Sequence, residues 1–149
     1  MVSWLQYLII SVRSCLRSLS DVVSYNKGFE SARMKEMAEA FPEYKKELQH
    51  IIDRLVDPLP IIRASVYDKD FQGSYSIKTV APSLIGDTFS YEGLAIADGG
   101  AASQGFITLI TEKLSAKDRK QLCTDMIRYC NQDTMSMVEL VRWMRIQAN

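Results

Sequence analysis

The apolar positions along this chain recur mainly at steps of three and four residues, the period of amphipathic α-helices. The spacing predicts helices over residues 4–19, 29–41 and 42–56. A shorter helix is predicted to follow residues 74–80 and to close near Pro82 or Gly86, and another begins after the loop at residues 98–100. Its core face should carry Ala101, Ala102, Phe106, Leu109 and Ile110. The last helix is predicted over residues 118–145, with a break near Asn131 and Gln132.

Strand signals are few. Residues 21–26 combine β-branched and aromatic side chains and precede the turn-prone pair Lys27-Gly28, so they predict a short strand. The prolines at residues 58 and 60 should end the helix before them, and residues 61–67 predict a second, weaker strand. Because an isolated strand leaves its backbone groups unpaired, either the chain is mainly helical or a missing segment or second copy supplies further strands.

Composition narrows the class of protein. The chain has 149 residues, 47% hydrophobic and 24% charged, which suits one globular domain over residues 1–149. Its 18 basic and 18 acidic side chains cancel, so any contact with nucleic acid must be local. Three cysteines without a CxxC pair indicate reduced thiols and a cytoplasmic protein. The apolar stretch at residues 4–10 is too short for a membrane span and lacks the basic flank of a signal peptide.

Glu30 interrupts the expected pattern of its helix. It heads a row whose other members, Met34, Met37 and Phe41, are apolar, so its carboxylate is expected to face the core. The alternative is that Glu30 is an ordinary acidic residue of a first helical turn, where the helix dipole favours negative charge.

Asp133 interrupts the last helix in the same way. It shares a helix face with Met126, Tyr129, Cys130 and Met137, and an inward carboxylate is costly unless a metal, a cation or hydrogen bonds compensate it. Tyr129 lies one turn earlier, so its hydroxyl is expected beside that carboxylate. The alternative is that Asp133 caps a new helix after a break, assisted by Thr134.

Two inward carboxylates on separate helices are typical of a site for hard divalent cations. Such cations select oxygen ligands, and a pair of them about 4 Å apart can bind both an attacking water and a leaving oxygen in phosphoryl transfer. Glu30 and Asp133 are therefore candidate ligands of Mg²⁺ or Mn²⁺, and Tyr129 is a candidate to orient the water.

Three segments carry a resemblance to a known family: residues 25–30 (Tyr-Asn-Lys-Gly-Phe-Glu), residues 73–78 (Gly-Ser-Tyr-Ser-Ile-Lys) and residues 129–134 (Tyr-Cys-Asn-Gln-Asp-Thr). In this order and spacing they resemble a bacterial domain-of-unknown-function family grouped with the DnaQ-like 3′-to-5′ exonucleases of the ribonuclease-H superfamily. The motif-bearing region covers residues 20–145, which resembles the C-terminal half of such a domain. The resemblance implies a helix-dominated α/β fold, a partial ribonuclease-H-like fold missing its N-terminal strands.

The resemblance also implies roles for individual residues. Glu30 and Asp133 would hold the metal, Tyr129 of the Tyr-x-x-x-Asp motif would position the nucleophilic water, and Asn26 would help orient Glu30. Lys78 would touch a substrate phosphate, although an ordinary exposed helix lysine is an equal interpretation. The lone histidine, His50, is expected on the polar side of its helix and in contact with solvent.

One departure from the family pattern affects the predicted function. No Asp-x-Glu motif on an apolar strand precedes Tyr25, and Asp68-Lys69-Asp70 lies downstream in an expected loop. The chain alone is therefore expected to bind metal poorly and to cleave nucleic-acid 3′ ends, of DNA or RNA, slowly or not at all. The alternative function is a catalytically inactive module that binds nucleic acid or another protein.

Overall fold

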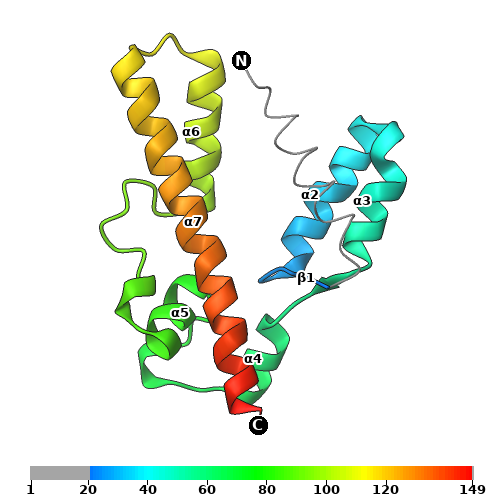
Figure 1. The fold of residues 1–149 in the computed structure, drawn as a ribbon, viewed down its shortest axis with the longest axis vertical. Coiled ribbons are helices and arrows are strands. Elements are labelled where there is room, and N and C mark those ends of the chain that lie inside the picture. Colours follow the sequence, from blue (N-terminus) through cyan, green and yellow to red (C-terminus); the bar gives the residue numbers. More distant parts are fainter. Residues whose placement is uncertain (1–20, 149) are drawn as a thin grey trace. The chain divides into compact units, whose positions relative to one another are not determined.

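The computed structural model describes residues 21–148, so the helix predicted over residues 4–19 lies outside the described residues. The chain divides into two compact units, Met1–Val66 and Tyr67–Asn149. In the described part, the structure is dominated by six α-helices and has one small parallel sheet of two strands (Figure 1). Helix dominance is thus confirmed. None of the helices in residues 21–148 is long and apolar enough to cross a membrane.

The sheet of the first unit joins β1 (Val22–Val23) to β2 (Leu55–Val56). The strand predicted at residues 21–26 is confirmed, although it is shorter. The prediction that Leu55 and Val56 extend a helix was wrong, because their backbones hydrogen-bond with β1: the amide of Ser24 donates to the Val56 carbonyl at 3.0 Å. This partner is more than thirty positions away, so local periodicity does not reveal it.

The helices of the first unit are α2 (Lys27–Ala40), α3 (Lys45–Ile52), preceded by a short 3-10 helix at Pro42–Tyr44, and α4 (Leu59–Ser65). The strand predicted at residues 61–67 was wrong, because α4 occupies most of it. Pro58 and Pro60 begin this helix, since a proline in a first turn lacks only an amide that has no partner there. Leu59 and Ile62 are buried.

The second unit begins with a 3-10 helix at Lys69–Phe71, followed by α5 (Ile77–Ile85) and a 3-10 helix at Asp87–Phe89. The predicted closure near Gly86 is confirmed, since Gly86 ends α5 with φ of 103°, a conformation that favours glycine. Phe71, Val80 and Ala81 are almost completely buried and form part of the core of this unit.

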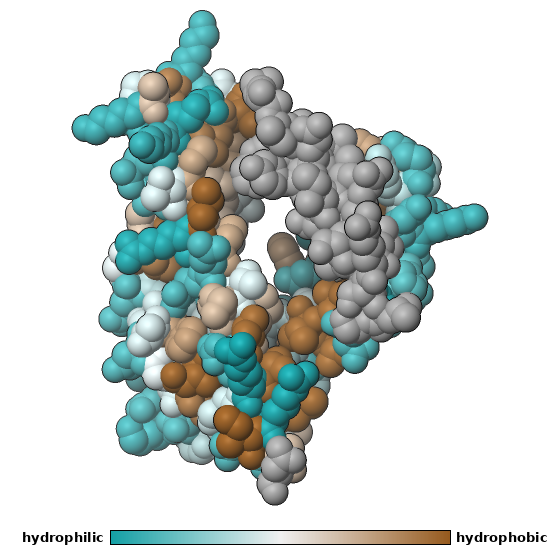
Figure 2. Space-filling model, viewed as in Figure 1, coloured by the Kyte–Doolittle hydropathy of each residue, from teal (hydrophilic) through white to brown (hydrophobic). Residues whose placement is uncertain are grey.

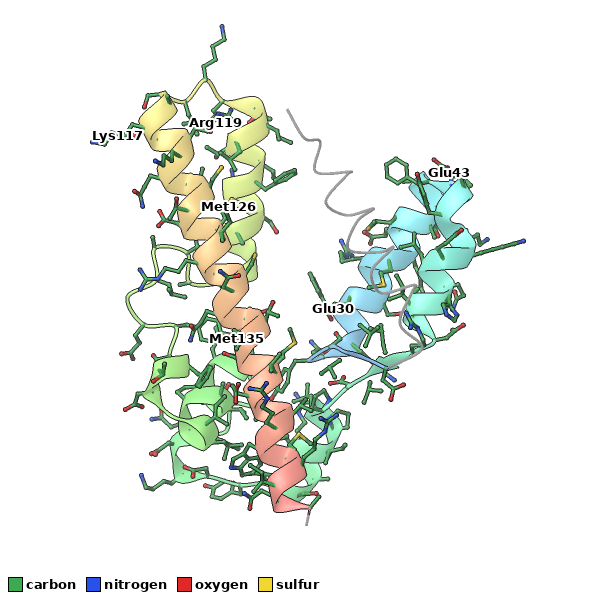
Figure 3. All side chains as sticks on the ribbon, viewed as in Figure 1. Glu30, Glu43, Lys117, Arg119, Met126 and Met135 are labelled. Carbon is green, nitrogen blue, oxygen red and sulfur yellow. The ribbon has the colours of Figure 1, made fainter. Side chains whose placement is uncertain are left out.

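A helical hairpin of α6 (Gly99–Thr111) and α7 (Ala116–Gln147) completes the second unit. Each helix starts with a side-chain cap: Asp98 accepts from the Ala101 amide and Ser115 from the Asp118 amide. Met126 lies between the helices (Figure 3) and belongs to a core cluster with Ile96 and Leu109.

Two details of this hairpin differ from expectation. The break near Asn131 and Gln132 was wrong, because α7 runs for 32 residues without interruption. Neither residue is a glycine or proline, so their polarity alone does not stop a helix. The predicted core face of α6 was also partly wrong, because Ile110 is 63% exposed and Ala101 is exposed too. Other apolar side chains also reach the surface, where Figure 2 shows hydrophobic and hydrophilic residues interleaved.

Candidate functional site

The Asp133 carboxylate lies on the inner side of α7 in the second unit. The hydroxyl of Tyr91, a residue that is only 7% exposed, donates a hydrogen bond to Asp133 Oδ1 at 2.9 Å. Because α7 is continuous through residue 133, the alternative that Asp133 caps a new helix was wrong. Its inward orientation is instead compensated by a buried phenol.

Tyr129 lies one turn before Asp133 and packs against Tyr91. Their rings meet edge to face, with centroids 6.2 Å apart. Partial burial, with the nearby Asp133 charge adding to it, raises the pKa of Tyr129 to about 12. The phenol is therefore protonated at neutral pH and can donate a hydrogen bond that orients a water.

Lys78, predicted as a phosphate contact, lies at the first turn of α5. Its Nζ donates to the Ala97 carbonyl at 2.6 Å and lies 5.9 Å from the centre of the Tyr91 ring. This is not the ordinary exposed helix lysine of the alternative interpretation, since two contacts fix its ammonium group beside Tyr91. Its contact with a phosphate stays a prediction.

An open groove of about 1300 Å³ lies within the second unit, and Lys78, Tyr91 and Gln132 line it, whereas Tyr129 and Asp133 do not. Lys78 and Arg128 contribute positive charge to its wall, and most of the remaining lining is polar. The groove also contains acidic side chains, namely Asp70, Asp87 and Glu92, so it has no strong net charge. A nucleic-acid strand that bound in this groove would be held by individual contacts and not by a uniform electrostatic field.

Gln132 and Tyr91 were missed by sequence reasoning. The Gln132 side-chain amide donates to the carbonyls of Thr88 and Ser90, at 3.1 and 3.2 Å, and so ties the segment before Tyr91 to α7. Both contacts with α7 span more than forty residues of sequence. No local sequence pattern indicates these two contacts, because Tyr91 lies in a loop.

Glu30 lies in the first turn of α2 in the first unit (Figure 3). Its position agrees with the helix-dipole interpretation. That interpretation does not explain its Oε2 atom, which is buried and has no hydrogen-bond partner in the described part of the chain. The expected core-facing row is only partly buried: Met34 and Met37 are half-buried, and Phe41 is 37% exposed.

Asp57 fixes the start of this helix and was also missed. Its carboxylate accepts from the amides of Asn26 and Lys27, at 3.0 and 2.9 Å, and from the Leu59 amide at 3.0 Å. Asn26 is the residue before α2, with φ of 67°, and its own side chain makes no capping hydrogen bond. Asp57 therefore holds the starts of α2 and α4 together, while the predicted role of Asn26 toward Glu30 stays a prediction.

The fit to a divalent cation is partial. Glu30 keeps a buried oxygen without a partner, and Asp133 is held through Oδ1, so each carboxylate has an atom suited to a metal. Among residues 21–148, however, no group of three or more His, Cys, Asp or Glu side chains is placed to bind a metal. Glu30 and Asp133 belong to different units, so their convergence stays a prediction. A complete metal site needs ligands beyond these two.

Comparison with known protein families matches the N-terminal half of the chain. Residues 4–76 are similar to a family described as Domain of unknown function (DUF2779). The matched range includes Asn26, Glu30 and Asp57 and ends before α5. No curated protein and no solved structure matches the chain.

Proposed function

We propose that this chain carries part of the active site of a metal-dependent 3′-to-5′ exonuclease that hydrolyses phosphodiester bonds at nucleic-acid ends. The observation that supports this most is the Asp133 carboxylate, which faces inward from α7, hydrogen-bonded by Tyr91 and one turn after Tyr129. A carboxylate and an orienting phenol in this relation are what the predicted Tyr-x-x-x-Asp motif requires. The parallel pairing of β1 with β2 suits a partial ribonuclease-H-like fold, since parallel strands are joined through helices.

In this proposal Glu30 and Asp133 would hold Mg²⁺ or Mn²⁺ together with carboxylates from another polypeptide segment or from a second copy of the chain. Ions bound there would supply charge stabilisation at the phosphate and would lower the pKa of a bound water. Tyr129, protonated at neutral pH, donates a hydrogen bond that orients this water. Asn26 helps to orient Glu30, and Lys78, at the edge of the groove, contacts a backbone phosphate.

A second candidate function is a catalytically inactive module that binds nucleic acid or another protein, including a second copy of the chain. The observation that favours it is the lack, within the described range, of three or more clustered metal-binding side chains. Zero net charge agrees with it, because nothing draws nucleic acid to the whole surface.

Hydrolysis of a labelled strand separates the two functions. The purified chain is incubated with Mn²⁺ and single-stranded DNA or RNA labelled at its 5′ end, and stepwise shortening from the 3′ end is followed. We expect slow shortening that the Asp133→Asn variant abolishes, since the amide keeps the size of the side chain but loses its charge. Asp125→Asn, on the same helix, is the matched control and should cleave as the unaltered chain does.

Three outcomes would contradict the exonuclease proposal. Shortening that persists in Asp133→Asn would point to a contaminating nuclease, and binding of the strand without shortening would favour the inactive module. A severe loss of folding in Asp133→Asn, measured by circular dichroism, would assign Asp133 a structural role in place of a catalytic one.

A further inference from the structure

The two-stranded sheet of the first unit has one apolar face that is partly exposed. Paired residues of neighbouring strands point to the same side of a sheet, and successive residues of one strand point to opposite sides. Leu55 and its partner Val22 therefore share one face, on which Leu55 is only 7% exposed. Val23 and Val56 share the other face, where they are 37% and 41% exposed. Two apolar side chains thus lie next to each other on an open side of the sheet.

The segment of chain that precedes β1 is the partner that fits this face. We propose that residues 4–19 form an amphipathic helix that packs on Val23 and Val56 and completes the core of the first unit. The inference does not rest on the exonuclease proposal. Parallel sheets are ordinarily covered on both faces, because the crossover connections between their strands pack against them. Residues 4–19 supply the cover on the second face.

The apolar pattern of residues 4–19 suits this role. Seven apolar side chains fall on one side of a helix with 3.6 residues per turn: Leu5, Leu8, Ile9, Val12, Cys15, Leu16 and Leu19. Ser14 and Arg17 fall on the opposite side. A helix of this kind is marginal in water by itself, since most helical stability in proteins comes from packing of the apolar face. The segment therefore needs an apolar surface of the kind that Val23 and Val56 offer.

The connection to β1 keeps the segment close to the sheet. Only Ser20 and Asp21 separate residue 19 from Val22, the first residue of β1. Links of about two to six residues are common between a helix and a strand that pack together. A helix over residues 4–19 would be about 24 Å long, which is more than enough to cover strands of two residues. The family match also begins at residue 4 and runs through both strands, so the segment and the sheet belong to one matched stretch.

The described part of the first unit also buries few apolar side chains. Within residues 21–66, α2 has no buried residue. The buried apolar side chains there are Leu48, Ile51, Leu55, Leu59 and Ile62. Chains below about 40 residues seldom form a stable core without disulfides, metals or association, and residues 21–66 are only slightly longer. The apolar side of residues 4–19 adds the burial that this unit requires.

Contacts between methyl groups test the proposal in the full chain. The valine and leucine methyl groups are labelled with carbon-13, and nuclear Overhauser effects are recorded from the methyl groups of Val23 and Val56. We expect contacts with the methyl groups of Val12 and Leu16. A mixture of labelled and unlabelled chains separates contacts within one chain from contacts between two copies.

A charge placed on the apolar side of the segment gives a second measurement. Val12→Asp should abolish these contacts and accelerate hydrogen exchange of the Ser24 amide, which donates to the Val56 carbonyl at 3.0 Å. Ser14→Asp adds the same charge on the opposite side of the predicted helix and is the matched control. It should keep both the contacts and the exchange rate of the unaltered chain.

Contacts of Val23 and Val56 with a second copy alone would overturn the proposal, because the face would then be an interface between chains. Absence of any contact with residues 4–19 would overturn it as well. If Val12→Asp does not fold, the contacts measured in the unaltered chain decide the question. Equal effects of Val12→Asp and Ser14→Asp would contradict the predicted orientation of the helix.

Discussion

The two units of this chain are built by different kinds of contact. In the second unit, capped helices pack along their length, and α6 and α7 share the buried cluster of Ile96, Leu109 and Met126. In the first unit, each strand has two residues, and α2 has no fully buried side chain. In this unit α2 packs on α3, the side chains of Leu48, Ile51 and Ile62 are buried, and the strand pair and Asp57 add contacts between segments distant in sequence. Helix packing therefore contributes to both units, and the first unit depends in addition on a few contacts between distant residues.

The two candidate ligands follow the same contrast. Asp133 is held by the buried phenol of Tyr91, so its unit positions it fully. Glu30 retains a buried oxygen without a partner in the described residues, so its unit positions the helix but does not satisfy the carboxylate. Burying a carboxylate oxygen without a partner costs free energy. A metal ion or a hydrogen-bond donor from another segment is therefore expected to bind it.

The largest expected effect comes from removing a core ring of the second unit. Phe71 is 1% exposed and packs edge to face on Tyr75, whereas Phe29 in the first unit is 64% exposed. Phe71→Ala should lower the free energy of unfolding by about 3–5 kcal/mol. Phe29→Ala, the matched control, should change it by about 0.5 kcal/mol or less. Urea denaturation measures both, and equal losses would contradict the difference in packing.

A smaller effect is expected when the shared cap of the first unit is removed. Asp57→Ala leaves the amides of Asn26, Lys27 and Leu59 without their acceptor, which should cost about 2 kcal/mol. Hydrogen exchange of these amides should accelerate while exchange in α7 stays unchanged. Asp53→Ala is the control, because Asp53 is exposed and accepts a hydrogen bond from the Gln49 side chain one turn earlier. Unchanged exchange in Asp57→Ala would show that α2 does not need this cap.

The smallest expected effect is on stability at low pH and involves Asp98, which caps the start of α6. The hydrogen bond from the Ala101 amide, helped by the Lys78 charge, lowers the pKa of Asp98 below its ordinary value of 3.8. A carboxyl whose pKa is lowered on folding contributes stability above the ordinary pKa and loses it as the pH falls through the folded value. Asp98→Asn should therefore flatten the pH dependence of stability below about pH 4. Identical acid-unfolding curves for the variant and the unaltered chain would contradict this.

Sequence patterns predicted the helices of the second unit better than the strands of the first. Residues that cap or end a helix, such as Asp98 and Gly86, act on their immediate neighbours, and the structure places both at helix ends as expected. Leu55 and Val56 continue the apolar spacing of α3, and only their pairing with β1 turns them into a strand. Pro58 and Pro60 follow one helical pattern and begin the next helix. The presence of prolines alone therefore did not indicate whether a helix ends or begins there.

In the candidate site, too, local sequence patterns predicted only features that depend on neighbouring residues. Asp133 was predicted to face the core from its position on a helix face, which is a local property, and the structure shows it half-buried with the hydroxyl of Tyr91 as a hydrogen-bond partner. Tyr91, Gln132 and Asp57 were not predicted, because each acts on a partner about thirty or more residues away. A single sequence does not indicate which distant polar groups will meet.

The central claim is that Glu30 and Asp133 bind one divalent cation, and paramagnetic line broadening by Mn²⁺ tests it most directly. In nuclear magnetic resonance spectra, backbone amides near residues 30 and 133 should broaden at the same Mn²⁺ concentration, and Asp133→Asn should abolish both effects. Broadening near one of these residues alone, or broadening near residue 30 that survives in Asp133→Asn, would contradict a shared site.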